Sequence, residues 1–197
     1  MAYDAALIEQ RAHRERLSRG EAEEEVWLLE HDPVITTGRR DAGVDPHAVE
    51  AAGYGFFATE RGGLATCHEP GQLVGYVLVD ARSIGVRRTV EAVEEGILAW
   101  VGHGASRRPG YPGIWIGRDK VCAVGLHFRG GFTMHGFALN LVNDLRGFAL
   151  ITPCGIVDGG VAAIRRFRPD APGPAAAAEG VGAALVRALL DARARTR

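Results

Sequence analysis

The sequence predicts an α/β fold, a single domain with a mixed, largely antiparallel sheet and packed helices. Strand-like and helical stretches both occur along the chain, but without the regular strand–helix–strand alternation of a parallel sheet. Three short strands within residues 114–142 are separated by glycine turns, as antiparallel neighbours usually are. The chain has 197 residues, enough for one large core, so we expect residues 1–197 to form one domain.

Helices are predicted where apolar residues recur at helical spacing. A polar helix with a thin apolar side is expected over residues 4–18. A second helix is expected from Thr89, a candidate N-cap, to the glycines at 102 and 104. A Pro/Gly/Ala-rich link then leads to a last helix over about residues 175–193, which we assign to packing.

The strand predictions rest on apolar runs bounded by turn residues. Residues 23–38 indicate two short strands with a break at Pro33. The run "QLVGYVLVD", residues 72–80, is almost continuously apolar, which is typical of a strand buried on both faces. The segment "RRPGYPG", residues 107–113, is expected to be a loop because of its prolines and glycines.

Composition gives broad limits on function. The chain is 47% hydrophobic and 24% charged, which is ordinary for a soluble globular protein. Its formal net charge of −1 gives no reason to expect nucleic-acid binding. Paired arginines remain, and they form either a local basic patch or scattered solvated side chains: Arg39–Arg40, Arg87–Arg88, Arg107–Arg108 and Arg165–Arg166.

Targeting signals and cysteine usage indicate the compartment. The first residues lack the pattern of a secretory signal, and no apolar run approaches the ~20 residues of a membrane span. Cys67, Cys122 and Cys154 are an odd number without C-x-x-C spacing, which argues against a disulfide framework and a structural zinc site. We therefore expect a cytoplasmic protein with free thiols, no membrane contact and no metal.

The stretch "RGGLATCHEPGQ", residues 61–72, is the first candidate site. Its glycines permit either a hairpin turn or a close approach of the backbone to a ligand. It matches neither the P-loop pattern nor the dinucleotide fingerprint, so a nucleotide cofactor is not expected.

The three thiols differ in their surroundings. Cys122 lies in an apolar strand, where a thiol usually acts as a small buried hydrophobe. Cys67 lies beside His68, an arrangement open to reaction or metal binding, although no further ligands cluster nearby in the sequence. Cys154 is held between Pro153 and Gly155, a stiff turn that suits a nucleophile beside free backbone N–H groups.

A nucleophilic thiol needs a neighbour that lowers its pKa, and the candidates are Lys120, His68 and His135. Lys120 is the only lysine in the chain, which reflects either coding bias or a role that arginine cannot fill. Lysine can release its proton when desolvated, so a cysteine and a lysine together can perform acyl transfer. His135 is either a hydrogen-bonded residue at a strand end or a ligand contact. The small residues Gly136 and Ala138 would admit a thin apolar ligand.

Four segments carry a resemblance to a known family: "RGGLATCHEPGQLVGY", "GIWIGRDKVCAVGL", "MHGFALN" and "ITPCG". In this order and spacing, together with "HDPVITTGRR", they resemble the lipoyl/octanoyl transferases of lipoate biosynthesis. That family belongs to the superfamily of biotin and lipoate protein ligases, so the resemblance implies a biotin/lipoate ligase-like α/β fold. It covers most of residues 31–155.

The resemblance implies a reaction. An octanoyl (or lipoyl) group passes from octanoyl-acyl carrier protein to a cysteine, and then from this thioester to a lysine amine of a lipoyl domain. By the family pattern, the thioester cysteine is Cys154 and its partner is Lys120. The acyl pocket is formed by Arg61, Gly62, Gly63, Leu64, Ala65, Thr66, Cys67, His68, Ala123, Val124, Gly125, His135, Gly136, Phe137 and Ala138.

The implied partners are octanoyl-acyl carrier protein and the lipoyl domains of 2-oxoacid dehydrogenases and of the glycine cleavage H protein, with no cofactor. Two residues depart from the family pattern T-Y-H-G-P-G-Q, because Cys67 replaces its tyrosine and Glu69 its first glycine. Cys67 is thus expected as a second thiol near the pocket. The alternatives are an ATP-dependent lipoate or biotin ligase, a non-catalytic acyl-binding module, and a transferase whose base is His68 or His135.

Overall fold

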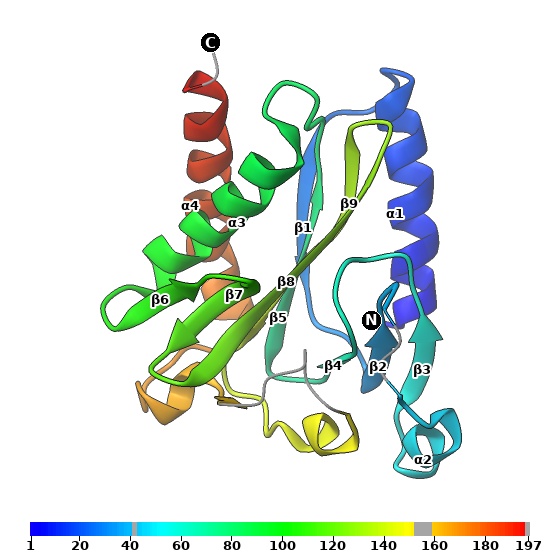
Figure 1. Cartoon of the computed structure of the whole chain (residues 1–197), viewed down its shortest axis with the longest axis vertical. Coiled ribbons are helices and arrows are strands. Elements are labelled where there is room, and N and C mark those ends of the chain that lie inside the picture. The colour runs from blue at the N-terminus through cyan, green and yellow to red at the C-terminus, as the bar shows by residue number, and fades with distance from the viewer. Residues whose placement is uncertain (41–42, 152–158, 196–197) are drawn as a thin grey trace.

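The computed structural model describes residues 1–40, 43–151 and 159–195. In these ranges a large sheet separates two helical layers (Figure 1). Helices α3 (Gly85–Val101) and α4 (Pro174–Ala194) pack together on one face, and α1 (Tyr3–Ser18) packs on the other. This is the mixed α/β arrangement that the sequence predicts.

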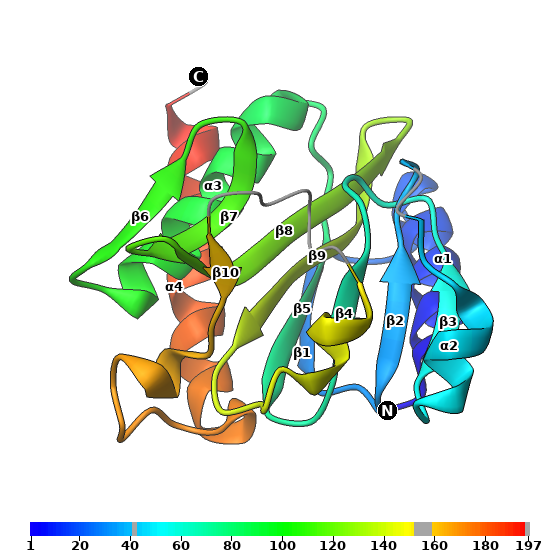
Figure 2. The same ribbon diagram turned by 60° about the horizontal axis from the view of Figure 1, so that its bottom comes forward.

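The large sheet is built mainly from antiparallel neighbours. In the described residues its main path runs β1 (Glu25–Leu29), β5 (Gln72–Leu78), β9 (Phe132–Asn140), β8 (Asp119–Arg129), β7 (Tyr111–Ile116) and β6 (Ala105–Arg108). A short strand, β10 (Gly160–Val161), adds parallel to β8, opposite Asp119 and Lys120 (Figure 2). The turns predicted within 114–142 are confirmed as the connections between β7, β8 and β9.

Strand β5 shows how the pattern of apolar residues produces the layers. Successive side chains of a strand point to opposite faces. Leu73 and Val77 accordingly join the core under α3 and α4, whereas Val74 and Tyr76 pack towards α1. Every residue of β5 is buried, so the prediction of a strand covered on both faces is confirmed.

A smaller sheet lies beside the large one (Figure 2). It consists of β2 (Val34–Thr37) between β3 (Gly55–Ala58) and β4 (Thr66–His68), with the short helix α2 (Pro46–Ala51) next to it in sequence. Strand β4 pairs antiparallel with β2, in the register Ile35 opposite Cys67. This sheet brings the glycine-rich loop before β4 towards the large sheet.

Two local predictions are wrong. Helix α3 begins at Gly85, four residues before the predicted cap, and Thr89 lies inside it with its hydroxyl donating to the Gly85 carbonyl over 2.7 Å. Residues 107–113 are not an open loop, because β6 and β7 form a hairpin around the turn at 109–110. No helix in the described ranges is long and apolar enough to span a membrane.

Candidate active site

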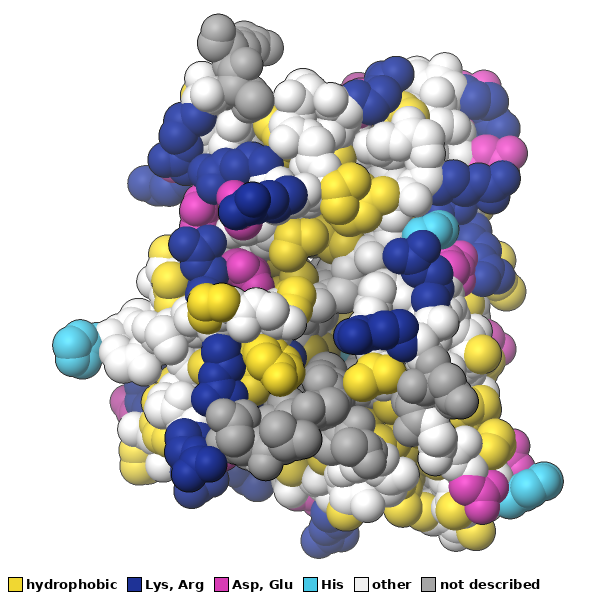
Figure 3. Space-filling view, viewed as in Figure 1, with side chains coloured by type: hydrophobic (Ala, Val, Ile, Leu, Met, Phe, Trp, Pro, Cys, Tyr) yellow, Lys and Arg dark blue, Asp and Glu magenta, His cyan; other side chains and the backbone are white. Residues whose placement is uncertain are grey.

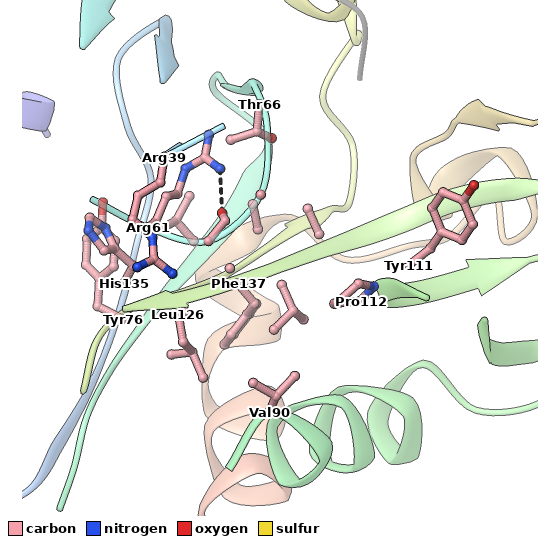
Figure 4. Close-up of a pocket in the computed structure, with 18 of the residues that line it drawn as sticks. Arg39, Arg61, Thr66, Tyr76, Val90, Tyr111, Pro112, Leu126, His135 and Phe137 are labelled. Atoms are coloured by element: carbon pink, nitrogen blue, oxygen red, sulfur yellow. Dashed lines mark hydrogen bonds between the residues drawn. The ribbon is translucent and has the colours of Figure 1, made fainter. Parts of the chain in front are cut away.

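A cavity of about 280 Å³ lies between the glycine-rich loop, β8, β9 and the start of α3. In Figure 4, Tyr76 and His135 border one end, Tyr111 and Pro112 border the other, and Val90 comes from α3 below. Its volume is close to the lower end of the ~300–1,000 Å³ range of small-molecule sites. The cavity therefore suits a small, narrow ligand.

Close backbone approaches build the upper wall. A Cβ on Gly38 would lie 2.3 Å from the Gly63 carbonyl oxygen, and one on Gly125 would lie 3.0 Å from the Gly62 carbonyl oxygen. The Gly62 amide also donates to the Leu126 carbonyl over 3.1 Å. The loop is therefore held between the end of β2 and strand β8, which requires glycines rather than a simple hairpin turn.

Arg61 fastens this loop from inside. Its guanidinium is almost fully buried and donates to the Thr36 carbonyl oxygen over 2.6 Å and to the Thr36 hydroxyl over 2.9 Å. It also donates to the Gly62 carbonyl over 3.1 Å. Several donors in a rigid planar group can bind two segments at once, so Arg61 ties the loop to β2 and shapes the cavity wall.

The pairing of β4 decides which residues of "TCH" face the cavity. Thr66 and His68 line it, whereas Cys67 points the other way and packs with Ile35 and Val49. The expectation of a second thiol at the pocket is thus corrected by the two-residue period of the strand. Burial, with the Glu69 carboxylate nearby, raises the pKa of the Cys67 thiol.

The buried histidines at the cavity are neutral. Burial lowers the pKa of both His68 and His135 to about 3. The Gln72 amide donates to the Cys67 carbonyl (3.0 Å) and to Asn140 Oδ1 (2.8 Å), so its oxygen accepts from His68 Nδ1 over 2.8 Å. His68 Nε2 is then the unprotonated nitrogen, able to accept a hydrogen bond.

His135 has an unusual backbone. Its φ of 58° lies in the left-handed region, which is uncommon for residues other than glycine and is found at functional sites. The His135 amide donates to Gln10 of α1 over 2.9 Å. In the described residues His135 Nε2 has no hydrogen-bond partner, so this end of the cavity holds a polar atom available to a ligand.

Lys120 lies at the opposite end. The side chain is only 4% exposed and also lines the cavity. Its ammonium donates to the Pro112 carbonyl over 3.0 Å and lies 5.1 Å from the centre of the Trp115 ring. A carbonyl dipole and an aromatic face stabilise a buried cation without neutralising it, so Lys120 can still attract a thiolate.

Glu94 is a buried carboxylate near Lys120 that the sequence reasoning missed. It accepts a hydrogen bond from the Gly113 amide over 2.7 Å. Burial raises the pKa of Glu94, and this hydrogen bond is the main effect that opposes the increase, with smaller ones from Arg107 and Lys120. The signal was present, because Glu94 lies on the apolar side of α3, four residues after Val90 and three before Ile97.

The other residues predicted for the site fall into two groups. The structure brings Gly63, Ala123, Val124, Gly136, Phe137 and Ala138 to the cavity with those already described. Leu64 and Ala65 do not line it, and neither does Cys67. Cys154 lies outside the described residues. Cys122 is fully buried and burial raises its pKa, as expected of an inert core thiol.

The described residues on both sides of Cys154 converge on Lys120. Phe148, Val161 and Lys120 line one small cavity adjoining Thr66 and Ala138. Strand pairing sets Val161 opposite Lys120, and the Ala162 amide donates to the Lys120 carbonyl over 3.0 Å. Over residues 1–40, 43–151 and 159–195, no group of three or more His, Cys, Asp or Glu could hold a metal ion.

The fold and the site define an α/β protein with a glycine-walled cavity beside a buried lysine. Residues 1–188 match the family model "Lipoyl protein ligase A/B catalytic domain". The chain is 41% identical over 175 residues to an octanoyltransferase of Alkaliphilus metalliredigens, covering 84% of this chain and 80% of that protein. It is 40% identical over 180 residues to an octanoyltransferase of Nitratidesulfovibrio vulgaris, covering 86% and 82%.

Solved structures share the fold. A lipoate-protein ligase A bound with ATP superposes with a TM-score of 0.68 at 19% identity, covering 92% of this chain and 78% of that one. The bipartite lipoate protein ligase of Thermoplasma acidophilum gives 0.62 at 20%, covering 92% and 76%. The chain belongs to the lipoyl protein ligase A/B catalytic domain family, and within it to the octanoyltransferases.

Proposed function

We propose that this protein transfers an octanoyl group from acyl carrier protein to a lysine amine of lipoyl domains, through a thioester on Cys154. The chain's relatives named octanoyltransferase support the reaction type. The observation that carries the assignment to this site is the glycine-walled cavity with Lys120 at one end. We further propose that residues 1–197 act as one catalytic domain.

In the first step the Cys154 thiolate attacks the carbonyl carbon of the octanoyl thioester. A new C–S bond forms, the bond to the carrier thiol breaks, and the carrier leaves as a thiol after gaining a proton. In the second step the target lysine amine attacks the acyl-enzyme. A C–N bond forms, the Cys154 thiolate leaves, and the amine gives up a proton.

Lys120 would stabilise both thiolates and relay these protons. Support comes from the chain on either side of Cys154, because Phe148 and Val161 border one cavity with Lys120. Chain length also limits how far Cys154 can lie from Ile151, because it is three positions further along the chain and an extended residue spans at most ~3.6 Å. His68 Nε2 is the alternative proton acceptor.

The acyl chain would lie along the apolar middle of the cavity, against Val90, Leu126 and Phe137 (Figure 4). Each buried methylene contributes about 0.8 kcal/mol, so an eight-carbon chain gains several kcal/mol from this surface. Figure 3 shows hydrophobic side chains around a hollow on this face, with basic side chains on both sides. Basic residues at this opening would suit acidic protein partners.

Intact-protein mass spectrometry tests the proposal. Wild-type protein incubated with octanoyl-acyl carrier protein should gain the mass of one octanoyl group, and Cys154→Ala should gain none. Adding a lipoyl domain should remove the adduct and add the same mass to that domain, without ATP. Modification that requires free octanoate and ATP would instead indicate a ligase, and wild-type turnover by Cys154→Ser would refute the thioester.

A further inference from the structure

Glu69 is a buried carboxylate that the cavity does not explain. It follows β4 in the turn to β5, it is 4% exposed, and it does not line the cavity. Burying a carboxylate is costly unless hydrogen bonds compensate for the lost water. The hydrogen-bond partners of Glu69 indicate what it does.

The carboxylate accepts hydrogen bonds mainly from one segment, residues 143–147. Oε1 accepts from Asn143 Nδ2 over 3.0 Å and from the Leu145 amide over 2.7 Å. Oε2 accepts from the Gly147 amide over 3.4 Å and from the Tyr54 hydroxyl over 3.0 Å. Hydrogen bonds to an ionised acceptor are the strong ones, so Glu69 fastens this segment at three points.

The segment also packs tightly where Glu69 holds it. A Cβ on Gly147 would lie 2.2 Å from Cys67 Sγ and 2.6 Å from Tyr54 Cε1. Gly147 thus lies directly against Cys67 and Tyr54, with no room for a side chain at position 147.

Leu145 shows that the anchor imposes a conformation. Its φ of 66° is left-handed, which is unfavourable for leucine, and its amide is the one closest to Glu69. From there the chain continues through Phe148, Leu150 and Ile151, which pack against Cys67 and its neighbours. Three residues after Ile151 comes Cys154.

We propose that Glu69 is a positioning residue for acyl transfer: by fixing residues 143–151 it sets where the chain enters the segment that holds Cys154. The proposal rests on the proposed function of Cys154 as the acyl acceptor. Glu69 touches no substrate and acts through this segment.

Glu69→Gln tests the proposal with little change in volume. Glutamine keeps only one of the two acceptor oxygens, so its NH2 group would face either the Asn143 and Leu145 donors or the Gly147 donor. The matched control is Glu30→Gln. The Glu30 carboxylate accepts a hydrogen bond, over 2.8 Å, from the amide of Gly71, which lies in the same turn as Glu69, but Glu30 does not bind residues 143–147. We expect hydrogen exchange of residues 143–151 to accelerate at least tenfold in Glu69→Gln only. Single-turnover acylation of Cys154 should also fall at least tenfold, with KM for the carrier protein within twofold.

Two results would overturn the proposal: wild-type acylation despite faster exchange, or equal loss of acylation in both variants. If Glu69→Gln does not fold, Gly147→Ala provides a second test, because it disturbs the contact between residue 147 and Glu69 and leaves Glu69 intact. A wild-type acylation rate in that variant would also overturn the proposal. If the wild-type protein forms no octanoyl adduct, the proposed function is wrong, and the positioning role of Glu69 is wrong with it. If the wild-type protein does form the adduct, a negative result for the Glu69 variant refutes only the positioning role.

Discussion

Lys120 donates a hydrogen bond from its ammonium to the Pro112 carbonyl over 3.0 Å, which holds the amine at the cavity wall. Lys120→Met keeps the stem of the side chain and removes the amine. If Lys120 moves protons at Cys154, we expect single-turnover acylation to fall about 10²–10⁴-fold, the usual contribution of general acid–base catalysis.

Lys120→Arg provides the control for charge. Guanidinium retains the positive charge but does not release a proton at ordinary pH, and it is bulkier beside Gly113. We therefore expect no recovery of turnover. Wild-type rates in either variant, measured from pH 6 to 9, would assign the proton transfer elsewhere, first to His68.

Gly125 tests the cavity wall. Alanine here places a methyl carbon 3.0 Å from the Gly62 carbonyl oxygen, so the loop must move by a few tenths of an ångström. We expect KM for octanoyl-carrier protein to rise several-fold, and shorter acyl chains to lose less than longer ones. Gly173→Ala is the control, because its Cβ would meet nothing within 4 Å. Equal KM values in both variants would show that the wall is not sensitive to this contact.

Much of this site could be predicted from the sequence because its residues follow strand periodicity and short motifs. The buried strand β5 and the turns between β7, β8 and β9 come from local patterns. The prediction for Cys67 was wrong because a motif shows only that a residue is near the cavity. The register of β4 with β2 decides which face of the sheet its side chain takes.

Strand register, a local backbone hydrogen bond and one long-range contact account for what the sequence did not show. The hairpin at 107–113 forms although Pro112 lacks an amide, because strand register shifts nearby, between Arg107 and Arg108. Helix α3 begins at Gly85, whose amide donates to the Ala81 carbonyl over 2.7 Å, a contact invisible to a propensity argument. The Glu69 anchor joins residues more than seventy positions apart.

The cysteines should differ sharply in reactivity. Burial raises the pKa of both Cys67 and Cys122, which keeps them protonated and inaccessible. If Cys154 is the nucleophile, iodoacetamide at pH 7 should label Cys154 first, at least a hundredfold faster than the others. Peptide mapping after partial alkylation checks this order. Early labelling of Cys67 would contradict it.

Stability should decrease on acidification because of the buried histidines. The pKa of His68 and of His135 is about 3 in the folded protein and near 6.5 when unfolded. Between these values the unfolded state binds more protons, so the free energy of unfolding falls as pH drops from about 6.5 towards 3. The slope should be on the order of 1 kcal/mol per pH unit for each histidine.

Urea unfolding at several pH values measures that slope. His135→Asn should reduce it, since asparagine tolerates the left-handed backbone and does not titrate. His103→Gln, at an exposed position, should leave it unchanged. An unaltered slope in His135→Asn would mean that His135 does not contribute.

The basic surface at the cavity should govern binding of the carrier protein. Arg39 and Arg40 are exposed at its edge, whereas Arg107 pairs with Glu95 over 3.8 Å and Arg108 lies 4.6 Å from the Trp115 ring centre. Arg39→Glu with Arg40→Glu should therefore raise KM for octanoyl-carrier protein about tenfold at low salt, and more than the same change at 107 and 108. At 0.5 M salt, screening of the charges should make the change in KM smaller. Unchanged KM at low salt after neutralising all four arginines would exclude docking through this surface.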